Sequence, residues 1–184
     1  MADSRKNIFL TGAPSSGKTT VIKKVVQQLT LPARGFYTEE ERLEGRRVGF
    51  TMKTLDWKTG YLAHQNIKSE FCVRRYGVSI ENIESVAVPS ISSENENTII
   101  ILDEIGKMEC FSEAFKKAAI KALDSPNIVI GTITLGGDDF IASVKKREDI
   151  EILEVNQGNR NALPDVILRK IRDLTGASEG SPER

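Results

Sequence analysis

Apolar runs alternate along the chain with segments of helical periodicity. Apolar runs at 98–102 and 128–133 predict strands buried on both faces, because such strands lack polar alternation, and further strands are expected at 7–10 and 151–155. Strands that alternate with helical segments are typical of a parallel sheet covered by helices. The pattern therefore predicts an α/β fold with a mostly parallel central sheet.

Helical spacing of apolar residues predicts the segments that connect these strands. One helix is expected over about 18–29 and another over about 111–123, each with one apolar face. A final helix is expected to have Pro164 in its first turn, where proline is favoured. A short helix is predicted at 80–88, followed by a polar loop at 90–97.

The segment at about 35–76 has a different character. Two β-rich stretches, 35–38 and 48–52, flank a charged turn at Glu44-Gly45, and a second turn is expected at 56–60. We therefore predict one or two antiparallel hairpins inserted into the main sheet.

Length and composition favour one globular domain over 1–175, with a flexible, small and polar tail at 176–184. Lys plus Arg and Asp plus Glu both number 26, so the net charge is zero and nucleic acid is not indicated as a partner. No apolar run approaches the roughly 20 residues that span a bilayer. Cys72 and Cys110 are interpreted as reduced thiols. We expect a cytoplasmic, monomeric protein with no membrane partner.

A complete phosphate-loop motif, G-x-x-x-x-G-K-[ST], lies between the first predicted strand and helix. Glycines let the backbone N–H groups turn inward around phosphates, and the following helix directs its positive end at the anion. Lys18 can reach the β- and γ-phosphates, and the Thr19 hydroxyl can bind Mg²⁺. The eight residues of the motif are Gly12, Ala13, Pro14, Ser15, Ser16, Gly17, Lys18 and Thr19.

Two carboxylates follow the buried run at 98–102. Asp103 lies where open α/β sheets place their ligand crevice, which makes it the expected second partner of Mg²⁺. Glu104 can orient and deprotonate a water in line with the γ-phosphate, as hydrolysis requires. We therefore predict a nucleoside triphosphate phosphohydrolase with Lys18 and Glu104 as its catalytic residues.

The residues after Asp103 leave the base preference open. Asp103 and Gly106 fit the D-x-x-G pattern of small GTPases, but the chain has no Asn-Lys-x-Asp segment that would read guanine. Lys107 and Glu109 lie near the site in sequence, and Lys107 is equally compatible with a phosphate contact and with an exposed loop.

An arginine often neutralises charge that develops between the β- and γ-phosphates. The candidates are Arg46, Arg47, Arg147 and Arg160. Arg46 and Arg47 lie near a predicted turn and Arg160 lies between two asparagines, and the sequence does not choose among the four.

Two other functions compete with hydrolysis. A nucleotide or polynucleotide kinase would transfer the same phosphoryl group to a hydroxyl, although no lid segment with clustered arginines is present. A regulatory switch would use slow hydrolysis as a timer for a partner protein. Glu104 next to Asp103 favours water as the acceptor.

The sequence resembles the THEP-type, or cancer-related, nucleoside-triphosphatases over about residues 7–172. Matching segments near the beginning are 9–12, Gly35-Phe36-Tyr37-Thr38-Glu39, 45–50 and 54–55. The distinctive Asp103-Glu104-Ile105-Gly106-Lys107-Met108-Glu109 is followed by matching segments at 131–133, 159–161 and 163–165. The chain departs from the family at Ser15-Ser16, where relatives often have glycine, and at 134–140.

The resemblance implies a RecA-like three-layer α/β fold and slow, Mg²⁺-dependent hydrolysis of several nucleoside triphosphates (ATP, GTP, CTP and UTP) to diphosphate and phosphate. It also implies that nucleotide is bound by two stretches, the phosphate loop and the segment around Asp103. We take the second stretch as Ile101, Leu102, Asp103, Glu104, Ile105, Gly106, Lys107 and Met108.

Overall fold

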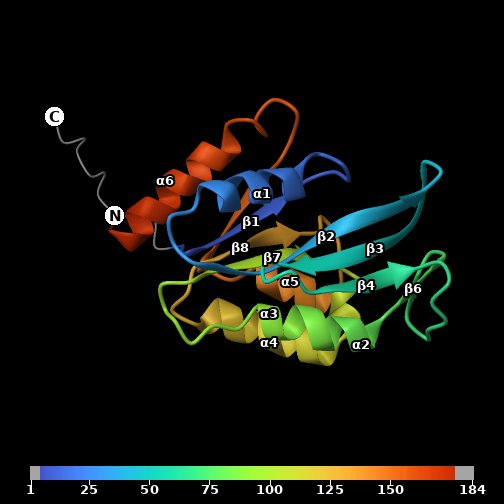
Figure 1. The fold of residues 1–184 in the computed structure, drawn as a ribbon. Coiled ribbons are helices and arrows are strands. Elements are labelled where there is room, and N and C mark those ends of the chain that lie inside the picture. The colour runs from blue at the N-terminus through green and yellow to red at the C-terminus, as the bar shows by residue number, and fades with distance from the viewer. Residues whose placement is uncertain (1–4, 177–184) are drawn as a thin grey trace.

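The computed structural model describes residues 5–176 and is built on a nine-stranded mixed sheet (Figure 1). The strand order is β5-β6-β4-β3-β2-β7-β8-β1-β9. The strands are β1 (Asn7–Thr11), β2 (Ala33–Leu43), β3 (Arg46–Thr54), β4 (Thr59–His64), β5 (Cys72–Val73), β6 (Tyr76–Val78), β7 (Ile99–Ile105), β8 (Val129–Ile133) and β9 (Ile150–Glu154). The helices are α1 (Lys18–Gln28), α2 (Ile80–Asn82), α3 (Val88–Ser90), α4 (Glu113–Asp124), α5 (Asp139–Lys145) and α6 (Leu163–Thr175).

One half of the sheet is parallel, as the apolar runs predict. Strand β1 lies between β8 and β9, and β7 pairs in parallel with both β8 and the first part of β2. Because parallel strands end at the same edge, the residues that follow β1, β7 and β8 meet there. The predicted α/β fold with a mostly parallel centre is confirmed.

The other half of the sheet is an antiparallel extension formed by β3, β4, β5, β6 and the second part of β2. Glu44 and Gly45 both have positive φ, 48° and 77°, and close the tight turn between β2 and β3. The predicted hairpins at 35–76 are therefore present, but β2 begins earlier, at Ala33, and its residues 33–36 belong to the parallel half.

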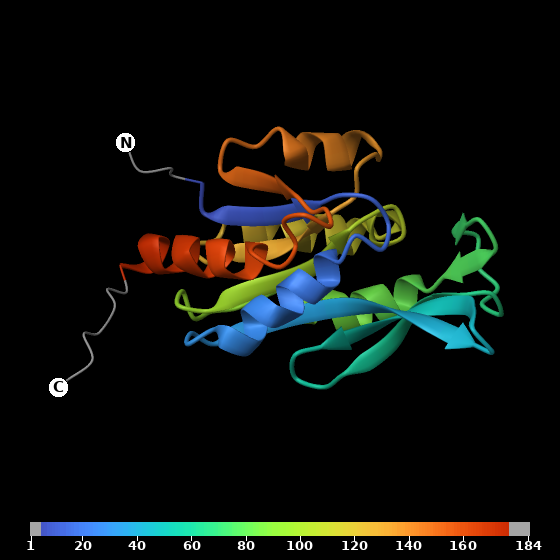
Figure 2. The same cartoon turned by 90° about the horizontal axis from the view of Figure 1, so that it is seen from above.

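Helices cover both faces of the sheet (Figure 2). On one face, α1 and α6 pack against the sheet around Ile22, Val25 and Ile167. On the other, α4, α5 and the continuous helical segment 80–90 enclose a second core around Phe36 and Phe115. Among residues 5–176, no helix combines the length and apolar character that a membrane crossing requires.

Three helical details differ from the predictions. Helix α5 was not predicted; it begins where Asp138 Oδ1 accepts a hydrogen bond from the Ile141 amide at 3.0 Å. Helix α4 begins at Glu113 and not near 111, because the Ser112 hydroxyl caps its first turn. The helix expected at 80–88 extends to Ser90, through Pro89. Of the predicted tail, residues 177–184 lie outside the described residues.

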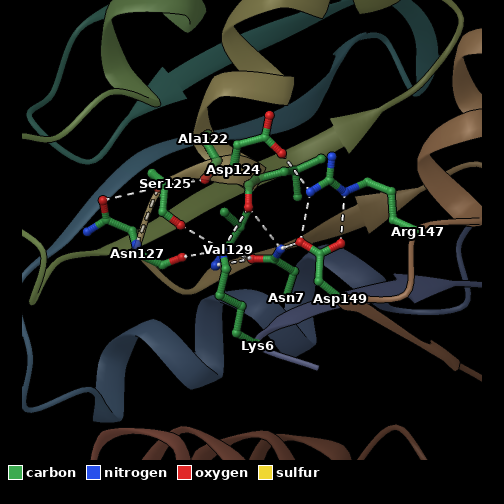
Figure 3. Close-up of polar contacts among 10 residues, drawn as sticks. Lys6, Asn7, Ala122, Asp124, Ser125, Asn127, Val129, Arg147 and Asp149 are labelled. Atoms are coloured by element: carbon green, nitrogen blue, oxygen red, sulfur yellow. Dashed lines mark hydrogen bonds and ion pairs between the residues drawn. The ribbon is translucent and has the colours of Figure 1, made fainter. Parts of the chain in front are cut away.

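A polar network ties together the amino ends of β1, β8 and β9 (Figure 3). Lys6 Nζ donates to the carbonyl oxygens of Leu123, Ser125 and Asn127 at 2.7, 2.8 and 3.1 Å. Burial lowers the pKa of Lys6, and the nearby carboxylate of Asp149 counters that effect. The Lys6 ammonium thus binds the carbonyl end of α4, where a helix favours a cation.

Asn7 is the centre of this network and is fully buried. Its Nδ2 donates to Asp149 Oδ2 at 3.0 Å and to the Leu123 carbonyl oxygen at 3.3 Å, and its Oδ1 accepts from the Val129 amide at 3.2 Å. An Asn7→Ala substitution leaves a buried amide and a carbonyl without these partners. We expect it to lower the free energy of unfolding by about 2–3 kcal/mol.

Urea denaturation measures this effect, with Asn66→Ala as the matched control. Asn66 is exposed, and its side chain makes no hydrogen bond to any residue of 5–176. Equal free energies of unfolding for the two variants would contradict a stabilising role for the network.

Candidate active site

The residues after β1 form a loop whose backbone bends through conformations that favour glycine. Gly12 has φ of 141° and Gly17 has φ of 104°, and Ser15 between them has φ of 61°. A Cβ atom on Gly12 would lie 2.6 Å from the Val155 carbonyl oxygen, so no larger residue fits there without a shift. Gly12 and Gly17 of the motif are thus required by the loop itself.

The amino end of α1 faces this loop without a side-chain cap. Gly17 occupies the N-cap position and contributes no side-chain hydrogen bond, so the first amides of the helix can bind an anion. Lys18 Nζ donates to the carbonyl oxygens of Gly12 and Ala13 at 3.0 and 3.1 Å, which holds the ammonium over the loop. Together these groups form a cradle for phosphate.

Asp103 lies near the end of β7 with 1% of its surface exposed. The Thr132 hydroxyl donates to its Oδ1 at 2.7 Å, whereas its Oδ2 is enclosed and has no hydrogen-bond partner among residues 5–176. Burial raises the pKa of Asp103; the hydroxyls of Thr132 and Thr19, the Thr38 backbone and the charge of Lys18 act in the opposite direction. A buried carboxylate oxygen without a partner, next to the Thr19 hydroxyl, suits a hard cation such as Mg²⁺.

Glu104 follows Asp103 and lines a cavity together with residues of the phosphate loop. Burial and the neighbouring Asp103 charge raise the pKa of Glu104, and Lys18 counters them. Burial, with a further contribution from Glu104, also raises the pKa of Glu109 well above its ordinary value. Both carboxylates approach Gly106: a Cβ there would lie 2.9 Å from Glu109 Oε2 and 3.0 Å from Glu104 Oε1. Gly106 therefore leaves the space that the two acidic side chains occupy.

The phosphate loop, Glu104 and Glu109 line one cleft of about 900 Å³ at the carboxyl edge of the parallel strands, and Asp103 is buried beneath it without lining it. Its lining on the phosphate-loop side includes Gly12, Pro14, Ser15, Gly17, Lys18, Thr19 and Thr20. From the end of β7 and the segment that follows it, the lining includes Glu104, Gly106, Lys107, Met108 and Glu109. The two stretches predicted from sequence are thus brought together at one site.

Not every residue of the second stretch faces the cleft. The side chains of Ile101, Leu102 and Ile105 are fully buried in the two cores on either side of the sheet. These three side chains anchor β7 in the cores and thereby fix the position of Asp103 and Glu104 near the end of the strand.

The structure separates the four candidate arginines. Arg47 lines the cleft from the antiparallel extension, whereas its neighbour Arg46 is exposed and does not line it. Arg160 lies beside the phosphate loop, with its Cδ 3.5 Å from the position of a Cβ on Gly17, and it does not line the cleft. Arg147 pairs with Asp124 and Asp149 in the network at the opposite edge of the sheet, which removes it from the candidates (Figure 3).

Sequence reasoning missed several residues of the site. Thr132, which bonds Asp103, lies within an apolar run, and a lone hydroxyl in a buried strand was the only signal for it. Phe50, Arg74 and Tyr76 line the cleft from the antiparallel extension. They carry no motif, and only the folded sheet brings them to the phosphate loop.

A mixed α/β sheet whose parallel half has a phosphate loop after β1 and an acidic pair near the end of β7, two strands away, defines a P-loop nucleoside triphosphatase. Comparison with known proteins agrees: a family model described as NTPase matches residues 7–168. The chain belongs to this nucleoside-triphosphatase family, which includes the THEP1 and cancer-related nucleoside-triphosphatase proteins.

Relatives match along nearly their whole length. Nucleoside-triphosphatase THEP1 of Thermotoga sp. (strain RQ2) is 42% identical, with 94% of this chain and 99% of that protein aligned. The cancer-related nucleoside-triphosphatase of Homo sapiens is 37% identical, covering 88% and 95%. The crystal structure of THEP1 from Aquifex aeolicus has a TM-score of 0.82 and 31% identity, and covers 90% of this chain and 98% of that chain.

Proposed function

We propose that this nucleoside-triphosphatase hydrolyses several nucleoside triphosphates in a Mg²⁺-dependent reaction that releases diphosphate and phosphate. The observation that carries the proposal is the unpartnered Oδ2 of Asp103, which is buried beside Thr19 and Lys18 and next to Glu104. The phosphate cradle and Glu104 line one cleft, and the buried Asp103 lies directly before Glu104 in the same strand, which supports a metal site beside the cradle.

In this proposal, each residue contributes to phosphoryl transfer in a separate way. The loop amides and the Lys18 ammonium bind the phosphates and stabilise the charge that develops on them. Thr19 and Asp103 hold Mg²⁺, which when bound neutralises the β- and γ-phosphate oxygens. Glu104 orients a water for attack on the γ-phosphorus and accepts its proton, and the burial that raises the pKa of this carboxyl makes its carboxylate a stronger base.

The proposed hydrolysis of all four nucleoside triphosphates is supported by the kind of contacts that the site offers. The contacts argued above all reach the triphosphate or the metal, which every nucleotide shares, and the sequence has no guanine-reading Asn-Lys-x-Asp segment. Arg160, beside Gly17 of the phosphate loop, stays a predicted contact to the nucleotide.

Phosphate release from ATP, GTP, CTP and UTP, measured with and without Mg²⁺, tests the proposed reaction. We expect all four to be hydrolysed in Mg²⁺ at similar rates, and activity to fall to background in excess EDTA and return when Mg²⁺ is restored. Full activity in EDTA would contradict the metal role of Thr19 and Asp103, and turnover of one triphosphate alone would contradict broad specificity.

The same assay separates hydrolysis from transfer to another acceptor. With γ-labelled triphosphate, we expect the label to appear as inorganic phosphate even when 5′-hydroxyl nucleic acid or a nucleoside monophosphate is added. Label appearing mainly on an added acceptor would show that the enzyme is a kinase.

A further inference from the structure

Glu109 lines the cleft, but the proposed reaction does not use it. It begins the short 3₁₀ turn Glu109–Phe111, and only 4% of its surface is exposed. A carboxyl group is seldom buried to this extent unless it has a partner. The salt bridges among the described residues do not include Glu109. A buried, unpaired carboxyl group at the wall of an active-site cleft is a candidate for a part in the reaction.

The side chain that faces Glu109 across Gly106 is that of Glu104. Glu109 Oε2 and Glu104 Oε1 each lie within 3.0 Å of the position of a Cβ on Gly106, so the two oxygens are less than 6 Å apart. A direct hydrogen bond joins oxygens about 2.7 Å apart, and one bridging water joins oxygens about 5.5 Å apart. The two carboxyl groups are thus close enough to share a hydrogen bond, either directly or through one water.

Backbone hydrogen bonds hold Glu109 in this place. The Cys110 amide donates to the Gly106 carbonyl oxygen, and the Ser112 amide donates to the Glu109 carbonyl oxygen, both at 3.1 Å. The residues on either side of the Glu109 side chain are therefore tied into one turn. This turn fixes Glu109 relative to Gly106, and hence relative to Glu104 on the other side of that glycine.

The surroundings of Glu109 favour its neutral form. Burial raises the pKa of Glu109 well above its ordinary value, and the charges of Glu104 and Asp103 raise it further, whereas the backbone at Glu109 and Gly106 acts in the opposite direction. Lys18, in contrast, favours the ionised form of Glu104. When two carboxyl groups share a buried site, one of them keeps a proton. Glu109 is therefore the hydrogen-bond donor of the pair, and Glu104 is the acceptor.

A donor at this position would orient the Glu104 carboxylate. A carboxylate has two oxygens that accept hydrogen bonds, and a neutral carboxyl group has one O–H to donate. Oε1 of Glu104 is the oxygen beside Gly106, so a bond from Glu109 to Oε1 leaves Oε2 for the attacking water. A carboxylate held at one oxygen keeps the other in a fixed direction, and orientation of this kind lowers the barrier of the chemical step.

We propose that Glu109 is a positioning residue for Glu104: its carboxyl group donates a hydrogen bond, directly or through one water, to Oε1 of Glu104 and so holds Oε2 toward the attacking water. The inference rests on the proposed function, because it takes Glu104 as the base. Glu109 keeps its proton throughout the reaction and acts only through Glu104.

Two substitutions of Glu109 separate a donor from a charge and from simple packing. Glu109→Gln keeps the shape and an N–H donor, so its kcat should stay close to that of the unmodified protein. Glu109→Met keeps a similar volume without a donor, so its kcat should fall about tenfold or more while nucleotide affinity and the unfolding midpoint are retained. Glu113→Met, at an exposed glutamate at the start of α4, is the matched control and should be fully active.

Two results of this comparison would overturn the proposal. A loss of kcat in Glu109→Gln as large as that in Glu109→Met would show that the charge of Glu109 is needed, as for a base or a metal ligand. Equal and normal kcat in both variants would show that Glu109 only fills space.

The double variant Glu104→Gln/Glu109→Met tests whether Glu109 acts through Glu104. We expect its kcat to equal that of Glu104→Gln alone, because nothing is left for Glu109 to position. A further tenfold loss in the double variant would show a separate role and overturn the proposal.

A measurement that does not depend on turnover separates this inference from the proposed function. In ¹³C-labelled protein with Mg²⁺ and a non-hydrolysable triphosphate analogue at neutral pH, the Glu109 carboxyl carbon is assigned by its loss in Glu109→Gln. We expect the chemical shift of a neutral carboxyl group. An ionised Glu109 would overturn the inference and leave the proposed hydrolysis intact, whereas full activity of the Glu104→Gln protein would contradict the proposed base, and this inference with it.

Discussion

Replacing Lys18 with Ala is expected to lower kcat/KM for ATP by roughly 10³-fold or more, the scale found when a charged group is removed from a phosphoryl-transfer site. Lys18 is the cation held above the loop carbonyls of Gly12 and Ala13, and its charge also lowers the cost of ionising Asp103 and Glu104. Its removal weakens phosphate binding and leaves two buried carboxylates without their nearest cation. Steady-state phosphate release over a range of ATP concentrations measures the effect.

Lys24→Ala is the matched control, because Lys24 is an exposed lysine on the same helix. Its activity and unfolding midpoint should equal those of the unmodified protein. A Lys18→Ala protein that is folded and retains more than about a tenth of normal activity would contradict the role of Lys18 at the phosphates.

Glu104→Gln is expected to reduce kcat by about 10²-fold or more while leaving nucleotide affinity nearly unchanged. Glutamine keeps the size of the side chain beside Gly106 but cannot accept the proton of the attacking water. Single-turnover phosphate release measures the chemical step, and titration with a fluorescent triphosphate analogue measures binding.

The control for this change is Glu148→Gln, at an exposed glutamate before β9. The decrease in kcat should be specific to Glu104. Normal turnover by the Glu104→Gln protein would eliminate Glu104 as the base, and an equal loss of binding would assign it to positioning the nucleotide.

The parts of the fold and site that could be predicted are those encoded by neighbouring residues. The phosphate loop is one continuous motif, and Asp103 and Glu104 directly follow a β-branched apolar run that indicates a buried strand. Parallel pairing then brings the two segments to one edge without further information.

The rest depends on pairing between distant segments. Thr132 reaches Asp103 only because β7 and β8 are neighbours in the sheet, and Arg74 reaches the cleft only through the register of β4 and β6. Arg147 shows the opposite case: a plausible arginine in sequence, it lies at the amino edge because it comes just before β9. Helix α5 was missed because its seven residues give too few turns for a clear period.

Strand β2 has a mechanical consequence for the cleft. Residues 33–36 pair with β7, which carries the acidic pair, and residues 36–43 pair with β3, which carries Arg47 and Phe50 of the cleft. One continuous strand thus runs through both the parallel half and the antiparallel extension of the sheet that form the cleft. A hinge between the halves would have to break the hydrogen bonds of this strand, so ligands are expected to meet a cleft of nearly fixed width, in which side chains and the connecting loops make the adjustments.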